Sequence, residues 1–191
     1  MGEPSVVFFR NGATEKGYTK KMRDNILGKE REIRNNKDES LHVFSSKGDL
    51  LLSLQGKGAS VKINTKLPEN AIITHNHPRS IGESGIRRIG SSFSVEDLMT
   101  TVNSNAREIR AVTPTYTFSI KRPKGGWNAT PQQVRQAYQK YDRQTQSEFT
   151  THLSRRGWSK TALDRANTLH WHRVNQLVAK EFGWNYTKKN R

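Results

Sequence analysis

A short apolar segment that ends in a histidine pair and a proline limits what this chain can fold into. Residues 71–74 (AIIT) are apolar and mostly aliphatic or β-branched, which is typical of a buried central strand. His75-Asn76-His77-Pro78 follows directly, and proline has no N–H to donate to a neighbouring strand. The tetrapeptide therefore marks the C-terminal end of a buried strand, at the point where the chain opens into a loop.

Apolar runs on both sides of this segment predict further strands. Residues 39–44 and 50–54 flank a Gly-containing turn and predict a β-hairpin, and the alternating residues 59–63 predict a third strand. Residues 108–113 and 116–121 predict a second hairpin. We expect the fold class to be α/β, with a mixed β-sheet flanked by helices.

Capping residues mark where helices begin. Ser94 precedes an acidic turn that contains Asp97 and then an apolar run, as at the start of a helix. Thr130 is followed by a proline and starts a helix that runs to about residue 150. Ser159 caps another helix, and a shorter one is expected at residues 29–34.

These signals divide the chain into three parts. Residues 1–29 form an N-terminal arm, residues 30–122 form the α/β domain, and residues 123–191 form a basic helical extension. The chain carries a formal net charge of +16. Residues 1–120 hold 18 basic and 13 acidic side chains, a charge of +5, whereas residues 121–191 hold 15 and 4, a charge of +11. We expect this last part to bind nucleic acid or an acidic protein, the alternative being a solvated helical surface.

The absence of cysteine restricts the chemistry of any metal site. Disulfides and thiolate ligands are excluded, so a metal would be bound by histidine and carboxylate side chains. No apolar stretch is long enough to span a membrane, and the start of the chain lacks the apolar segment of a signal peptide. We therefore expect a cytoplasmic protein with no membrane partner, and delivery to another cell stays open.

His75, His77 and Asp97 are the candidate metal ligands. Side chains two residues apart in an extended chain point the same way, so the two imidazoles can face one point in space. Asp97 lies in the first turn of the helix that follows the loop. Two histidines and one carboxylate leave a fourth position open, the arrangement of a catalytic zinc site. The alternative is that both histidines are exposed and that Ser94 and Asp97 form only a helix cap.

The ordered residues Glu39, His75-Asn76-His77-Pro78 and Ser94-x-x-Asp97 resemble the motif of the JAB1/MPN/Mov34 (JAMM) metalloenzymes. Asn76 between the histidines is most similar to the RadC-like branch, which also occurs in phage and bacterial toxin-type proteins. The resemblance covers about residues 30–120. It implies a bacterial or phage-encoded protein with a fold similar to the deaminase-like fold.

The resemblance also implies a function for each residue. His75, His77 and Asp97 would bind Zn²⁺, and Glu39 would accept a proton from the attacking water and return it to the leaving group. Ser94 would stabilise the developing oxyanion or position the water. The expected activity is zinc-dependent cleavage of a peptide or isopeptide bond in a protein or peptide-conjugate substrate.

The sequence departs from the family pattern between the second histidine and the serine. Residues 78–93 are longer than the family spacing and could cover the site or contact a substrate. They contain Ser80, Ser91 and Ser92, which are rivals of Ser94. Glu30 and Glu32 are likewise rivals of Glu39, although neither opens an apolar strand.

Two other readings of the function stay open. A metal-dependent nuclease or nucleic-acid-processing factor could use the same site, as the basic extension favours. A metal-free binding module of a phage or secreted protein is the third reading. His170 and His172 repeat the spacing of the first histidine pair, but on a helix their side chains diverge, so His170 should be buried and His172 exposed. We expect the tryptophans of the extension (Trp127, Trp158, Trp171 and Trp184) to be core residues.

Overall fold

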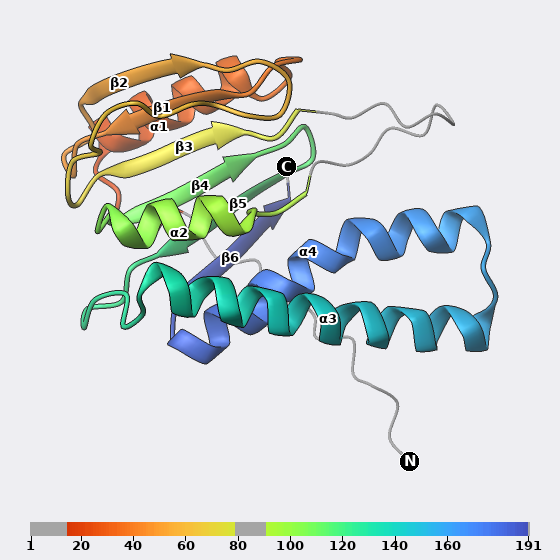
Figure 1. The fold of residues 1–191 in the computed structure, drawn as a ribbon. Helices are drawn as coiled ribbons and strands as arrows, with labels where there is room; N and C mark the ends of the chain where they lie inside the picture. The colour runs from red at the N-terminus through yellow and green to blue at the C-terminus, as the bar shows by residue number, and fades with distance from the viewer. Residues whose placement is uncertain (1–14, 79–90, 191) are drawn as a thin grey trace.

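Six strands form one mixed sheet at the centre of the computed structural model, which describes residues 15–78 and 91–190 (Figure 1). The protein is therefore α/β, as the sequence predicts. In chain order the described elements are α1 (Lys20–Ile33), β1 (Ser40–Phe44), β2 (Leu50–Gln55), β3 (Ile72–Asn76), α2 (Val95–Asn103), β4 (Glu108–Val112), β5 (Tyr116–Lys121), α3 (Pro131–Arg156), α4 (Lys160–Phe182) and β6 (Asn185–Asn190).

The strands lie in the order β2-β1-β3-β4-β5-β6. Among the described strands, β3 and β4 form the one parallel pair, and α2 lies in the connection between them. The other neighbours are antiparallel, including both predicted hairpins, β1 with β2 and β4 with β5. Strands β1, β3 and β4 are buried along their whole length, because each has a strand on both sides and helices pack on both faces of the sheet.

Alternating side chains divide the strands between two cores. One set faces α2, α3 and α4 and includes Val43, Ile73 and Phe118, which pack with Leu98 and Val174 from the helices. The other set faces α1, where Phe44 and Ile72 pack against apolar residues of that helix. Figure 1 shows α2 and α3 in front of the sheet and α1 on its other side. The fold therefore has three layers, with the sheet in the middle.

The face of the sheet that carries α1 also holds a buried ion cluster. Arg110 on β4, Glu30 on α1 and Glu108 on β4 have fully buried side chains. Arg110 Nε lies 2.5 Å from Glu30 Oε1, and Arg110 Nη1 lies 3.0 Å from Glu108 Oε1. The hydroxyl groups of Thr74 and Ser119 donate hydrogen bonds to the same two carboxylates. These contacts link α1 to three neighbouring strands.

Two local predictions differ from the structure. Residues 59–63 form no strand, and only an isolated bridge joins Lys57 to Ser60. Val61 and Ile63 pack against the main core instead of entering the ladder. The helix expected at residues 29–34 is the second half of α1, which begins at Lys20 within the part predicted as an arm.

The basic segment, residues 123–191, is mostly helical, but its last part is a strand that the sequence analysis did not predict. β6 pairs with β5 along its whole length and completes the sheet. Val174 and Val178 of α4 and Trp184 belong to the main core. The helices α3 and α4 form a long hairpin whose far end extends beyond the sheet (Figure 1). No helix of the described residues is long and apolar enough to cross a membrane.

Candidate metal centre

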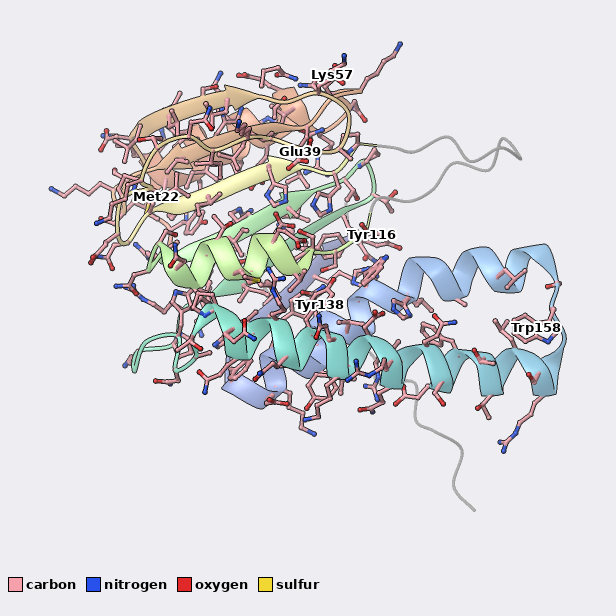
Figure 2. The ribbon with its side chains drawn as sticks, in the orientation of Figure 1. Met22, Glu39, Lys57, Tyr116, Tyr138 and Trp158 are labelled. Carbon is pink, nitrogen blue, oxygen red and sulfur yellow. The ribbon has the colours of Figure 1, made fainter. Side chains whose placement is uncertain are left out.

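One face of the sheet carries Glu39, next to the start of β1, and both histidines, at the end of β3. Leu41 of β1 lies opposite His75 of β3 in the antiparallel register. Side chains two residues apart share a face, so Glu39 and His77 follow on the same side, which is the face that α2 covers. Figure 2 labels Glu39 at the start of β1, close to where β3 ends. Two adjacent strands thus bring together residues that lie 36 positions apart in the chain.

His75, His77 and Asp97 converge, and their donor atoms all lie within 4.8 Å of one another. The two Nε2 atoms are 2.8 Å apart. Asp97 Oδ1 lies 3.5 Å from His75 Nε2, and Asp97 Oδ2 lies 3.6 Å from His77 Nε2. Zinc–ligand bonds of about 2.0–2.1 Å in a tetrahedral site place the ligand atoms roughly 3.3 Å apart. The three observed separations lie on both sides of that value, so the donor set fits one zinc ion with little movement.

Asp97 serves as a helix cap and faces the histidines at the same time. The Ser94 hydroxyl accepts a hydrogen bond from Asp97 N at 3.1 Å, and Asp97 Oδ2 accepts one from Ser94 N at 2.8 Å. This reciprocal capping box fixes the first turn of α2. The cap therefore does not exclude metal binding, because it orients the carboxylate towards the end of β3.

A backbone carbonyl group fixes the ring of His77. The Nδ1 atom of His77 lies 2.6 Å from the carbonyl oxygen of Ser91. A carbonyl oxygen can only accept, so Nδ1 carries a proton, and in the neutral form of the ring the Nε2 lone pair is directed at the cluster. Such a contact on the far nitrogen is the usual support of a metal-binding histidine.

The charges of the cluster shift one another's pKa values. Burial raises the pKa of Asp97, but the nearby histidines outweigh this effect and hold its pKa well below the usual range. Burial lowers the pKa of His75, but the carboxylates of Asp97 and Glu39 outweigh it, so the pKa is raised overall. Burial, helped by the negative charge of Asp97, raises the pKa of Glu39. The side chain of Glu39 therefore lies within the electrostatic range of all three candidate ligands.

Asn76, which the sequence analysis noted only for its likeness to the RadC-like branch, also has a structural role at the site. It lies between the two histidines and points to the opposite face, where its Oδ1 accepts a hydrogen bond from Ser40 N at 2.7 Å. Its Nδ2 donates to the carbonyl oxygen of Asp38 at 3.2 Å. These two hydrogen bonds fix the backbone on both sides of Glu39. The alternation of a strand was the signal, since a polar residue between two ligands must face away from them.

The rival carboxylates lie elsewhere. Glu30 belongs to the buried ion cluster on the face of the sheet opposite to His75 and His77. Glu32 is exposed on α1 and pairs with Lys29 at 2.6 Å. Of the rivals to Glu39, neither therefore lies in the cluster with His75, His77 and Asp97.

Ser94 and its rival serines have different contacts. Ser94 caps α2 as an acceptor, which leaves its hydroxyl hydrogen available for a substrate or water. Ser91 contributes its carbonyl group to His77, and the hydroxyl of Ser92 lies 2.9 Å from the Tyr186 hydroxyl. Ser80, and most of the 78–93 segment predicted to cover the site, lie outside the described residues.

The second histidine pair forms no metal site within the described residues. His170 Nε2 contacts Asp142 Oδ1 at 2.6 Å, and His172 Nδ1 contacts the Tyr186 hydroxyl at 2.9 Å. The prediction that His172 is exposed is wrong, because its side chain is 1% exposed and packs against Phe118. The strand β6 and its neighbour β5 cover this side of α4, which the sequence pattern of the helix alone could not reveal.

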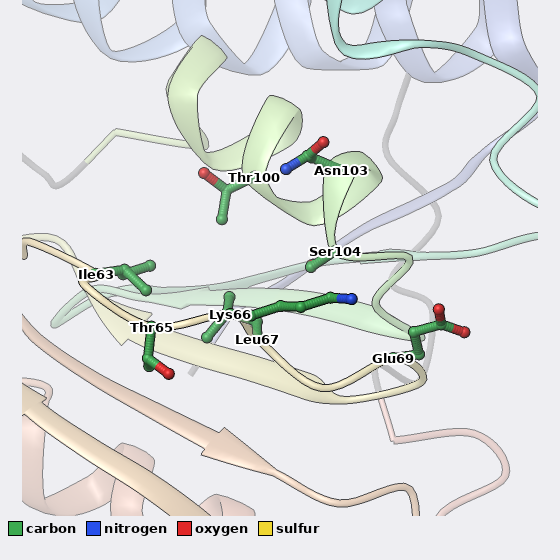
Figure 3. A pocket seen from close by; sticks show the side chains of 8 residues that line it. All are labelled: Ile63, Thr65, Lys66, Leu67, Glu69, Thr100, Asn103 and Ser104. Carbon is green, nitrogen blue, oxygen red and sulfur yellow. The ribbon is translucent and has the colours of Figure 1, made fainter.

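A hollow of the described surface lies away from the candidate centre. It has a volume of about 520 Å³ and is formed by the loop before β3 and the C-terminal half of α2 (Figure 3). Its side chains include Lys66, Glu69 and Asn103, whereas Asp97 lies in the first turn of α2. The hollow contains no cluster of candidate metal ligands.

Comparisons of the chain with family models, curated proteins and solved structures found no match. The likeness to the JAMM motif therefore stays a prediction that depends on the residues and their geometry.

Proposed function

We propose that the protein is a zinc-dependent hydrolase whose ion is bound by His75, His77 and Asp97. The convergence of these three side chains at the end of β3 is the observation that supports the proposal most directly. The burial of His75 and the partial burial of the other two ligands favour a bound ion, because little water is left to satisfy them. Zinc, when bound, would lower the pKa of a water molecule and polarise the bond to be cleaved.

Glu39 is the proton-transfer residue in this proposal. It shares a face with the candidate ligands, where its carboxylate can act as a general base. It accepts a proton from the attacking water and returns it to the leaving group. Ser94 donates its free hydroxyl hydrogen to the developing oxyanion or positions the water. The choice of a peptide or isopeptide bond as the substrate depends on the resemblance to the JAMM motif alone.

Substitution of Glu39 and of His75 separates proton transfer from metal binding. We expect Glu39→Gln to retain zinc and folding while hydrolysis falls by about 10²–10⁴-fold, the usual contribution of general acid–base catalysis. His75→Ala should lose both zinc and activity. Elemental analysis and hydrolysis of peptide and ubiquitin-type conjugates measure the two properties, with the exposed Glu32→Gln as the matched control.

Three outcomes would change the assignment. Wild-type protein that takes up no zinc would rule out the metal site and favour the metal-free binding module. Loss of zinc in Glu39→Gln would make Glu39 a ligand and Asp97 the doubtful one. Full activity of Glu39→Gln would remove Glu39 from the mechanism.

A metal-dependent nuclease or nucleic-acid-processing factor is the second candidate function. The charge of +11 on residues 121–191 favours it, as does Trp158, which is 54% exposed near the far end of the α3–α4 hairpin (Figure 2). Incubating the zinc-loaded protein with DNA and RNA, in parallel with the conjugates, decides between the two. Cleavage of nucleic acid that is lost in His75→Ala would replace the first proposal.

A further inference from the structure

The segment of residues 91–93 lies between the candidate metal centre and the C-terminal third of the chain. On one side, the Ser91 carbonyl oxygen accepts the proton of His77 Nδ1 at 2.6 Å. On the same side, the ring of Phe93 lies against that of His75, with 6.3 Å between the ring centroids. The position of this segment therefore determines where the Ser91 carbonyl group meets the His77 ring.

Tyr186 of β6 holds the middle of the segment. Its hydroxyl lies 2.9 Å from the hydroxyl of Ser92 and 2.9 Å from His172 Nδ1 on α4. Ser92 is 2% exposed and His172 is 1% exposed, so water contributes little to these contacts. The Tyr186 hydroxyl can donate to one of these partners and accept from the other. Ser92 is thus tied through one tyrosine to both β6 and α4.

Two further donors hold the end of the segment. The carbonyl oxygen of Phe93 accepts a hydrogen bond from the Tyr138 hydroxyl of α3 at 2.9 Å. It accepts a second from Asn175 Nδ2 of α4, also at 2.9 Å. Both donor side chains are buried, and Asn175 Nδ2 is itself fixed by a bond to the Trp171 carbonyl oxygen at 2.8 Å. A carbonyl oxygen with two buried donors has little freedom to move.

We propose that Tyr186, Tyr138 and Asn175 are positioning residues for the metal centre, an inference that rests on the proposed zinc site. They fix the 91–93 segment so that the Ser91 carbonyl group keeps His77 in the tautomer whose Nε2 lone pair faces the ligand cluster. The partner of the far nitrogen decides which tautomer a histidine adopts and how its ring is aimed. Here the partner is a backbone group in a segment without regular structure, so the three side chains supply the rigidity that a strand or helix would give.

The test compares the wild-type protein with Tyr186→Phe and with the double variant Tyr138→Phe/Tyr186→Phe. Each substitution removes only a hydroxyl group. Tyr141→Phe is the matched control, because the hydroxyl of this half-buried residue of α3 accepts from Lys140 Nζ at 3.3 Å, on the exposed side of the helix. Full-length proteins are used at a temperature at which thermal melting shows all four to be folded.

Two measurements are made on each protein. NMR chemical shifts of the ring nitrogens report the tautomer of His77 in metal-free protein, and competition with a chromophoric chelator gives the dissociation constant for zinc. We expect a single Nδ1–H tautomer in the wild type and in Tyr141→Phe. The double variant should show a mixture of tautomers, with a zinc dissociation constant that is about 10-fold higher, as is usual when the support of a ligand is lost.

The outcomes separate this inference from the proposed function. If the tautomer and the zinc dissociation constant of the double variant equal those of Tyr141→Phe, the two tyrosine hydroxyl groups do not position His77 and the inference is overturned. If the wild type binds no zinc, but the double variant alone loses the single His77 tautomer while Tyr141→Phe keeps it, the positioning of His77 stands and the zinc hydrolase fails. A loss of thermal stability with no change of tautomer would show a structural contribution alone and would also overturn the inference.

Discussion

At the scale of single residues, the local environment gives chemically identical side chains different properties. His75 and His172 are both buried, but the pKa of His75 is raised because two carboxylates outweigh the effect of burial. For His172, burial together with the positive charge of Lys188 lowers the pKa to about 3. His172 is therefore neutral in the folded protein at neutral and mildly acidic pH.

This shift makes stability depend on pH. In the unfolded chain His172 has a pKa of about 6.5 and takes up a proton as the pH falls, whereas in the folded protein it stays neutral down to about pH 3. The unfolded state therefore binds more protons in this window, and stability is lost as the pH falls from about 6.5. We expect the unfolding free energy of the wild type to fall more steeply than that of His172→Phe, by up to about 1.4 kcal/mol per pH unit. Urea unfolding with chelator present, at several pH values between about 7 and 4, measures the difference, and parallel curves for the two proteins would contradict it.

At the scale of elements, α1 is attached to the sheet by charge as well as by apolar contact. Glu30 reaches from α1 to Arg110 on β4, and both side chains are completely buried. The apolar contacts of α1 involve few residues. Met22 and Ile26 are the residues of this helix in the apolar cluster that also contains Phe44 and Ile72 of the sheet. Breaking a buried ion pair destabilises the fold strongly. Removal of one partner leaves the other charge buried, away from water and with less opposite charge around it.

Glu30→Ala should therefore destabilise the protein by about 3 kcal/mol or more, as breaking a buried ion pair does. Glu32→Ala, two positions along the same helix on its exposed side, should change stability by less than about 0.5 kcal/mol. Urea unfolding of both variants gives the comparison. Equal effects of the two substitutions would mean that the ion cluster does not hold α1 in place.

At the scale of the whole molecule, the basic C-terminal third has two parts, one packed in the core and one exposed. The ends of α3 and α4 next to the sheet, together with β6, belong to the core and support the 91–93 segment. The far end of the hairpin extends beyond the sheet and carries the exposed Trp158 and Arg155. Of the four tryptophans, Trp127 and Trp184 are buried and Trp171 is partly buried, as the sequence predicts, and Trp158 is the exception.

We expect the far end of the hairpin to bind single-stranded nucleic acid. Trp158 offers a face for base stacking, and the exposed Arg143 and Arg155 of α3 offer charge for phosphates. Trp158→Ala should weaken binding of a labelled oligonucleotide by about 1–3 kcal/mol, and Arg143→Glu/Arg155→Glu should also reduce its dependence on salt. Fluorescence anisotropy of the full-length protein at several salt concentrations measures both, with Trp171→Phe as a control at a partly buried site. Binding that is unchanged in all variants, or absent at low salt, would leave the charge as a solvated surface.

The sequence by itself determined the features that depend on a few neighbouring residues. The spacing of His75 and His77, the Ser94 cap and the two hairpins follow from strand alternation, capping chemistry and turn signals, all of which act over a few positions. The placement of Glu39 on the same face as the histidines needed the register of two strands, which the structure gives, and a shared function of these residues stays a prediction of the motif resemblance.

Only the tertiary structure decided the features that depend on distant partners. β6 has a polar sequence (NYTKKN) with no apolar alternation, and it is a strand because the edge of β5 has hydrogen-bonding groups to be paired. Arg110 and Glu30 read as surface residues until the fold buries them against each other, 80 positions apart. Tyr186 contacts Ser92 for the same reason, because the return of the chain after α4 places it beside a residue 94 positions earlier. Burial and pairing across such separations are set by the packing of the whole chain, and no local pattern records them.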